Sequence, residues 1–191
     1  MKAVCVFCGS NVGRNPAYEK AAISVGTALA NAGLKLVYGG GKVGLMGAVA
    51  DAAIAAGGHV AGVMPRALAE REIAHAGLGE LHVVETMHQR KTMMADLADA
   101  FIALPGGAGT LEEFFEQWTW AQLGVHGKPC GLLNVADYFG PMIAMMHRIV
   151  AEGFIAQRYV EMLVIESEIE PMLNRFAYYT PPPQKWQVPK V

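Results

Sequence analysis

Short apolar segments alternate with longer helical patterns along almost the whole chain. The apolar segments have strand length, and they are Ala3–Cys8, Lys35–Tyr38, His59–Met64, Leu81–Val84, Ala100–Leu104, Cys130–Val135 and Met162–Ile165. Most are continuously apolar, which is typical of parallel strands covered on both faces. The helical segments between them are Pro16–Ala32, Leu45–Ala56, Met87–Ala98, Thr110–Leu123 and Tyr138–Ala151. This order predicts an α/β fold, a Rossmann-like doubly wound parallel sheet with helices on both faces.

The length and composition indicate one globular unit. The chain has 191 residues, of which 53% are hydrophobic and 17% charged, so a large buried core is expected. We expect a single domain over residues 1–176 and a proline-rich tail over residues 177–191 that is extended or disordered. A net charge of -2, without a basic patch, argues against a nucleic-acid partner. The N-terminal residues do not resemble a signal peptide and no apolar run is long enough to cross a bilayer, so we expect a cytoplasmic protein without a membrane partner.

Cys5 and Cys8 form a C-x-x-C pair inside the first predicted strand. In a cytosolic chain this spacing raises the hypothesis of a redox site. An odd spacing along a strand, however, directs two side chains to opposite faces, and neither cysteine lies at a helix N-terminus. The pattern therefore favours two packed cysteines.

The loop after the strand Lys35–Tyr38 is rich in glycine. Gly39, Gly41 and Gly44 match G-x-G-x-x-G between a strand and a helix, where dinucleotide folds bind a pyrophosphate. The next strand, however, does not end in the acidic residue that would hold a ribose hydroxyl. A dinucleotide site, as in a nicotinamide-dependent oxidoreductase, and close packing of strand on helix both stay open, and the pattern favours packing.

A second glycine-rich turn runs from Pro105 into a helix. Gly106, Gly107 and Gly109 leave backbone N–H groups bare at the helix start, which favours a bound phosphate. No lysine follows the glycines, so the turn is not a P-loop. Thr110 and Glu113 have the spacing of a capping box, in which the threonine caps the helix and the glutamate bonds back to it. A structural role and a functional role for Glu113 therefore both stay open.

The helix Met87–Ala98 opens with two cations, although positive charge opposes the helix dipole at that end. Either this end is solvated, or Arg90 and Lys91 meet a bound anion. If the strands Leu81–Val84 and Ala100–Leu104 are neighbours, Arg90 and Glu113 converge on one crevice. Such a pair suits cleavage of a glycosidic bond, because the carboxylate orients or deprotonates water while the arginine holds the substrate and keeps the carboxylate ionised.

Several motifs together are recognisable. Pro105–Glu113 carries PGGxGTxxE in full, Met87–Lys91 reads MHQRK, and Thr119–Gly124 reads TWAQLG. With FCGS near the N-terminus and YGGGxxGLMG over Tyr38–Gly47, the chain resembles the LOG (Lonely Guy) family of cytokinin-activating phosphoribohydrolases up to about Phe176.

The resemblance implies hydrolysis of a nucleoside 5′-monophosphate, AMP or N6-isopentenyl-AMP, to free base and ribose 5-phosphate, without a cofactor or metal. It implies that Arg90 and Glu113 are catalytic, and it suggests a homodimer or larger homo-oligomer. The substrate contacts that we expect besides this pair are Ser10, Met87, Lys91, Gly106, Gly107, Ala108, Gly109, Thr110 and Thr119.

Three questions stay open at this point. The preferred base is not defined, and neither is a contribution from Glu72, which lies in a segment longer than its counterpart in the plant enzymes. The alternative function is that of a non-catalytic carrier of a nucleotide or of molybdenum cofactor. Relatives have also been labelled lysine decarboxylases, but no lysine here stands out as a pyridoxal phosphate site.

Overall fold

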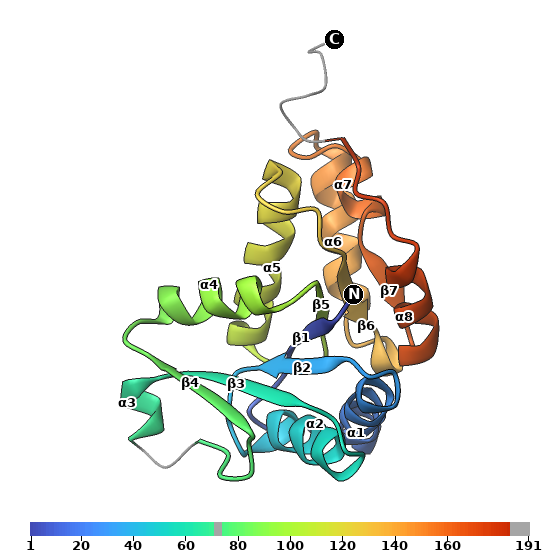
Figure 1. The fold of residues 1–191 in the computed structure, drawn as a ribbon. Helices are drawn as coiled ribbons and strands as arrows, with labels where there is room; N and C mark the ends of the chain where they lie inside the picture. The colour runs from blue at the N-terminus through green and yellow to red at the C-terminus, as the bar shows by residue number, and fades with distance from the viewer. Residues whose placement is uncertain (71–73, 184–191) are drawn as a thin grey trace.

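The computed structural model describes residues 1–70 and 74–183, and it contains a seven-stranded sheet (Figure 1). All of the strand pairs are parallel, and the order is β4-β3-β2-β1-β5-β6-β7. The strands are β1 (Ala3–Phe7), β2 (Lys35–Tyr38), β3 (Val60–Pro65), β4 (Glu80–Val84), β5 (Ala100–Ala103), β6 (Cys130–Leu133) and β7 (Val164–Glu166). The helices are α1 (Pro16–Asn31), α2 (Gly44–Ala55), α3 (Arg66–Ala69), α4 (Met87–Leu97), α5 (Ala108–Leu123), α6 (Gly140–Ala151), α7 (Arg158–Glu161) and α8 (Ile169–Ala177), with a 3-10 turn at Val135–Asp137.

The sheet is buried on both faces, and β1 shows why. Its residues are all buried and point alternately to two separate apolar clusters. One cluster contains side chains of α4, α5, α6 and α7, and the other contains side chains of α1, α2 and α8. The predicted doubly wound fold is therefore confirmed.

The cysteine pair follows the same alternation. Cys5 belongs to the first cluster and Cys8 to the second, so the two thiols lie on opposite faces of the sheet. Both are free, and burial raises their pKa values. The prediction of packed cysteines, rather than a redox pair, is confirmed. No helix among the described residues is long and apolar enough to cross a membrane.

The predicted elements agree with the structure to within a few residues at their ends, but α8 and the four-residue helices α3 and α7 were not predicted. Ile169, Met172 and Phe176 repeat at helical spacing and are buried against the sheet. This apolar stripe was present in the sequence. It lies directly before the proline-rich tail, in a part of the domain to which no helix or strand was assigned.

The condition on strand order under which Arg90 and Glu113 were expected to converge is not met. The strands Leu81–Val84 and Ala100–Leu104 are not neighbours, because β4 lies at one edge of the sheet and β3, β2 and β1 separate it from β5. The connecting helix α4 therefore crosses one face of the sheet, in contact with β4, β3, β2 and β1 (Figure 1). Its route back to β5 brings residues of α4 to the switch point between β1 and β5, where ligands of such sheets bind.

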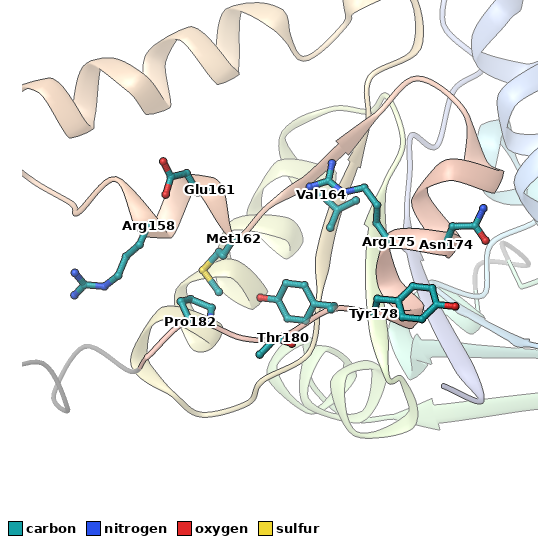
Figure 2. A pocket seen from close by; sticks show the side chains of 10 residues that line it. Arg158, Glu161, Met162, Val164, Asn174, Arg175, Tyr178, Thr180 and Pro182 are labelled. Atoms are coloured by element: carbon teal, nitrogen blue, oxygen red, sulfur yellow. The ribbon is translucent and has the colours of Figure 1, made fainter.

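The first part of the C-terminal tail lies against the rest of the protein. Tyr179 packs against the cluster that includes α8, and Pro181 lies beside Gly127. Figure 2 shows Thr180 and Pro182 at a cavity of about 640 Å³ whose other walls come from α7, β7 and α8. Residues 178–183 form no helix or strand. The expectation for residues 184–191 lies outside the described part of the chain.

Candidate active site

The glycine turn after β5 leads into the exposed N-terminus of α5. This helix begins at Ala108, with Gly107 as a cap residue that offers no side-chain hydrogen bond. The first N–H groups of a helix have no partner within it, so those of Ala108, Gly109 and Thr110 are available to a ligand. They border a cavity of about 310 Å³ at the carboxyl ends of β1 and β5.

The expected capping box at this helix is wrong. Because α5 starts two residues before Thr110, this threonine is the third helical residue and not the cap. Its side chain instead lies where a Cβ atom on Gly106 would be. Glu113 therefore has no capping role, and its position calls for another explanation.

Two glycines of the turn are not required by the fold. A Cβ atom on Gly107 or Gly109 would meet no atom within 4 Å, and neither residue has a positive φ. Glycine in a helix costs about 0.5–1 kcal/mol relative to alanine. The free space beside these glycines thus allows a ligand to come close to the N-terminus of the helix.

Replacing Gly109 by alanine is expected to raise stability and weaken ligand binding at once. The substitution should stabilise α5 by about 0.5–1 kcal/mol, which corresponds to roughly 1–4 °C in Tm for a chain of this size. The new methyl group would occupy the space in front of the N–H groups. Thermal unfolding and calorimetry with ribose 5-phosphate measure the two effects, and unchanged affinity would show that no ligand approaches there.

Arg90 and Glu113 form a buried ion pair at the same cavity. Nη1 of Arg90 lies 2.9 Å from Oε1 of Glu113, and the side chains are only 11% and 12% exposed. Nε of Arg90 donates to the carbonyl oxygen of Val63 at 3.0 Å. The start of α4 is fixed by a capping box between Thr86 and Gln89. The predicted convergence of Arg90 and Glu113 is therefore real, although α4 produces it and not adjacent strands.

The glycines after β2 serve packing. A side chain on Gly39 would overlap the guanidinium of Arg90, so the absence of a side chain here leaves the space that the arginine occupies. Gly44 has φ +59, and a side chain there would overlap the backbone of Ser10 and Asn11. These contacts account for two glycines of the G-x-G-x-x-G pattern without a dinucleotide.

Burial dominates the electrostatics of Glu113. It raises the pKa of this carboxyl above the ordinary 4.5, and the positive charge of Arg90 opposes the shift without reversing it. Arg90 thus lowers the free-energy cost of ionising the buried carboxyl group. A raised pKa also makes the ionised carboxylate a stronger base than an exposed glutamate, which suits the activation of water.

Lys91 does not line the cavity. Its Nζ atom lies 2.5 Å from Glu112 and 2.9 Å from Glu116, so it joins α4 to α5. Burial lowers the pKa of Lys91, but the two carboxylates outweigh burial and raise it. Thr119 is exposed farther along α5 and does not line the cavity either. Contacts of Lys91 and Thr119 with a substrate stay predictions.

Most other predicted site residues meet at this one cavity. Its walls include Ser10, Met87, Arg90, Gly107, Ala108, Gly109, Thr110 and Glu113. Gly106 lines a neighbouring cavity of about 250 Å³ instead, and Glu72 lies outside the described residues. The residues that sequence reasoning missed are Cys8, Gly9, Met46 and Glu112. Cys8 and Gly9 follow β1 directly, at the sheet edge where ligands of parallel sheets bind.

Comparison with known proteins identifies the family. A family model described as possible lysine decarboxylase matches residues 46–176. The cytokinin riboside 5′-monophosphate phosphoribohydrolase of Rhodococcoides fascians is 51% identical over 88% of this chain and 86% of its own. The Arabidopsis thaliana enzyme LOG7, with the same activity in its name, is 48% identical over 94% of this chain and 83% of its own. The chain belongs to the LOG family.

Solved structures of lower identity share the fold of this LOG family member. The molybdenum cofactor binding protein of Rippkaea orientalis aligns with a TM-score of 0.71 at 20% identity, covering 93% of this chain and 97% of that protein. The molybdenum cofactor carrier protein of Chlamydomonas reinhardtii aligns with a TM-score of 0.70 at 16% identity, covering 93% and 97%. At such identities the likeness shows the fold alone.

The decarboxylase description of the family model does not match the lysine beside the cavity. A lysine that forms a Schiff base needs a lowered pKa, so that its amine is free to react. Lys91 is held by two carboxylates and its pKa is raised. The geometry of Arg90 and Glu113 is therefore the better guide to the chemistry.

Proposed function

We propose that this LOG family member hydrolyses the N-glycosidic bond of adenosine 5′-monophosphates, with or without an N6 substituent, to free base and ribose 5-phosphate. The observation that carries the proposal is the buried Arg90–Glu113 pair, which shares one cavity with the open N-terminus of α5. The names of the relatives at 48–51% identity support the same activity.

The N-terminus of α5 would hold the 5′-phosphate, because bare N–H groups and the helix dipole both favour an anion. Among the described residues, the neighbouring cavity beyond Gly107 has no charged side chain in its wall, so it lacks the arginine or lysine that commonly binds a second phosphate. This arrangement favours a monophosphate substrate.

Glu113 would then face the ribose. Its carboxylate stabilises the oxocarbenium-like transition state and takes a proton from the attacking water. The water oxygen bonds to C1′ while the C1′–N9 bond breaks, and the electron pair of the C1′–N9 bond leaves with the base. The proton that Glu113 takes from the water passes, directly or through solvent, to the released base, which regenerates the carboxylate. Arg90 orients Glu113 through the 2.9 Å contact and holds the substrate at the same time.

The base would lie beside thioether side chains. Met46 and Met87 both line the cavity, and methionine adapts its shape to flat or irregular apolar groups. Such a wall accepts adenine and an adenine with an apolar N6 substituent. Release of base from AMP and from N6-isopentenyl-AMP, measured by chromatography, tests the activity and gives the preference between them.

A carrier function is the alternative that the shared fold suggests. A carrier needs to bind its ligand but has no use for a buried carboxylate that activates water. Calorimetry and base release on the same sample separate the two functions. Tight AMP binding without any release of base would favour the carrier, whereas turnover supports the hydrolase.

We also propose that two copies associate through β4 and α4. A hollow of about 710 Å³ lies between these elements, and apolar residues of both, including Val83 and Met93, line it. β4 is an edge strand on which Leu81 and Val83 are 39% and 42% exposed. Exposed apolar residues on a sheet edge are typical of an interface, and a second copy of the chain supplies a matching surface.

Replacing Val83 by lysine is expected to convert the dimer into a monomer, because the charge would have to be buried at the contact. Size-exclusion chromatography with light scattering gives the mass of the assembly. Met145→Lys, on α6 and 58% exposed, is the matched control and should leave the dimer intact. A dimeric Val83→Lys variant would show that the contact lies elsewhere.

A further inference from the structure

Two loops hold the carbonyl groups of the turn that precedes α5. The hydroxyl of Tyr138, from the segment between β6 and α6, donates to the carbonyl oxygen of Gly106 at 2.5 Å. The N–H of Gly9, after β1, donates to the carbonyl oxygen of Pro105 at 3.1 Å. Both carbonyls are thus held by hydrogen bonds from other segments of the protein.

The bond from Tyr138 controls the direction of a neighbouring N–H group. In a trans peptide the carbonyl of Gly106 and the N–H of Gly107 point in opposite directions within one plane. A peptide between two glycines turns over easily, because neither residue has a Cβ atom to oppose the rotation. We propose that Tyr138 is a positioning residue that holds this peptide with the Gly107 N–H directed at the phosphate of the substrate. This inference rests on the proposed function.

The segment that carries Tyr138 adopts a costly backbone. Ala136 and Asp137 have φ of 50° and 57°, a left-handed conformation that residues other than glycine seldom adopt. The side chain of Asn134 holds the segment in this shape, donating to Asp137 at 3.0 Å and accepting from the N–H of Phe139 at 2.7 Å. Strained residues fixed by their surroundings cluster at functional sites. Here the strained turn presents Tyr138 to Gly106.

The ring of Tyr138 is also supported from the opposite wall. The ring of Tyr18 meets it edge to face, with centroids 5.6 Å apart and planes at 75°. Gly13, with φ +75, leaves room for that ring, since its Cβ atom would lie 2.8 Å from Tyr18. The tyrosine is therefore fixed both by its own segment and by the ring of Tyr18 on α1, as a positioning role requires.

The variant Tyr138→Phe tests the proposal, since it keeps the ring and removes only the hydroxyl. Affinity for ribose 5-phosphate, measured by calorimetry, is expected to fall about three- to ten-fold, the range for one lost hydrogen bond. The KM for AMP should rise by the same factor while kcat changes less than about two-fold, because a phosphate contact acts equally on substrate and transition state. Tyr178→Phe, on a tyrosine that is 88% exposed, is the matched control and should change none of these values.

The outcomes separate this proposal from the proposed function. Unchanged affinity for ribose 5-phosphate in a folded Tyr138→Phe protein overturns the positioning role, whatever the wild type does to AMP. An equal loss of kcat and kcat/KM, with affinity retained, also overturns it. A wild type that binds ribose 5-phosphate but releases no base overturns the hydrolase. In that case the role of Tyr138 is still decided by comparing the affinities of the wild type and the Tyr138→Phe protein for ribose 5-phosphate.

Discussion

Replacing Glu113 by glutamine should lower kcat for base release by about 10²–10⁴-fold, the range for loss of a general acid or base. The amide keeps the shape of the side chain and can still accept a hydrogen bond from Arg90, so AMP affinity should stay within a few-fold of wild type. It neither takes a proton from water nor stabilises positive charge on the ribose. Initial rates by chromatography and affinity by calorimetry give the two values on the same protein.

Glu152→Gln is the matched control for this prediction. Glu152 follows α6 and pairs with Arg148 on the surface, in a contact that has no part in the cavity. Its loss should leave the rate of base release unchanged. A Glu113→Gln protein with wild-type kcat would mean that Glu113 is a structural partner of Arg90, and the catalytic proposal would then be wrong.

Arg90→Met is expected to affect both function and stability. Loss of a cation beside the reacting groups should lower kcat/KM by about 100-fold or more. Breaking a buried pair by removing one partner costs about 3–5 kcal/mol, because the remaining charge is left buried. The glutamate at position 113 can avoid part of this cost by binding a proton, so the loss of stability depends on pH.

The direction of that pH dependence follows from the pKa of Glu113. Burial already raises this pKa above 4.5, and removal of Arg90 takes away the charge that opposes the shift. Between 4.5 and the raised pKa the folded state binds more protons than the unfolded state, so stability falls as pH rises through this window. The window extends further upward in Arg90→Met, and the loss in Tm relative to wild type should be larger at pH 8 than at pH 5.

The double variant Arg90→Met/Glu113→Gln is the control for the stability effect. It removes the carboxyl that titrates, so the extra pH dependence should disappear and part of the lost stability should return. An equal loss of Tm at pH 5 and pH 8 in the single variant would show that Arg90 contributes through packing alone. Thermal unfolding of the three proteins at both pH values decides between these accounts.

The fold was predictable because local patterns determine it. Continuous apolar runs such as Val60–Met64 can only be buried on both faces, and helices of full length separate them. The position of a strand within the sheet is not a local property, since it depends on where each crossover helix packs. For this reason the sequence located β4 correctly but not its distance from β5.

Residues of the candidate site could be predicted where their type suits the chemistry and they come soon after the end of a strand. Gly107, Gly109 and Glu113 lie in the turn after β5 and the first two turns of α5, so motif and position agree. The pairing of Lys91 with Glu112 and Glu116 was not predicted, because it depends on the angle at which α4 meets α5. The division of the chain into residues 1–176 and a tail, the absence of a cofactor and the cytoplasmic location stay predictions.

The central claim is that the cavity at Arg90 and Glu113 breaks a glycosidic bond. Incubation of the wild-type protein with AMP, followed by chromatography for adenine and an assay for ribose 5-phosphate, tests it most directly. The structure predicts the two products in equal amounts, with release at least about 100-fold slower in the Glu113→Gln protein. A folded wild type that binds ribose 5-phosphate but frees no base from AMP or N6-isopentenyl-AMP would contradict the claim.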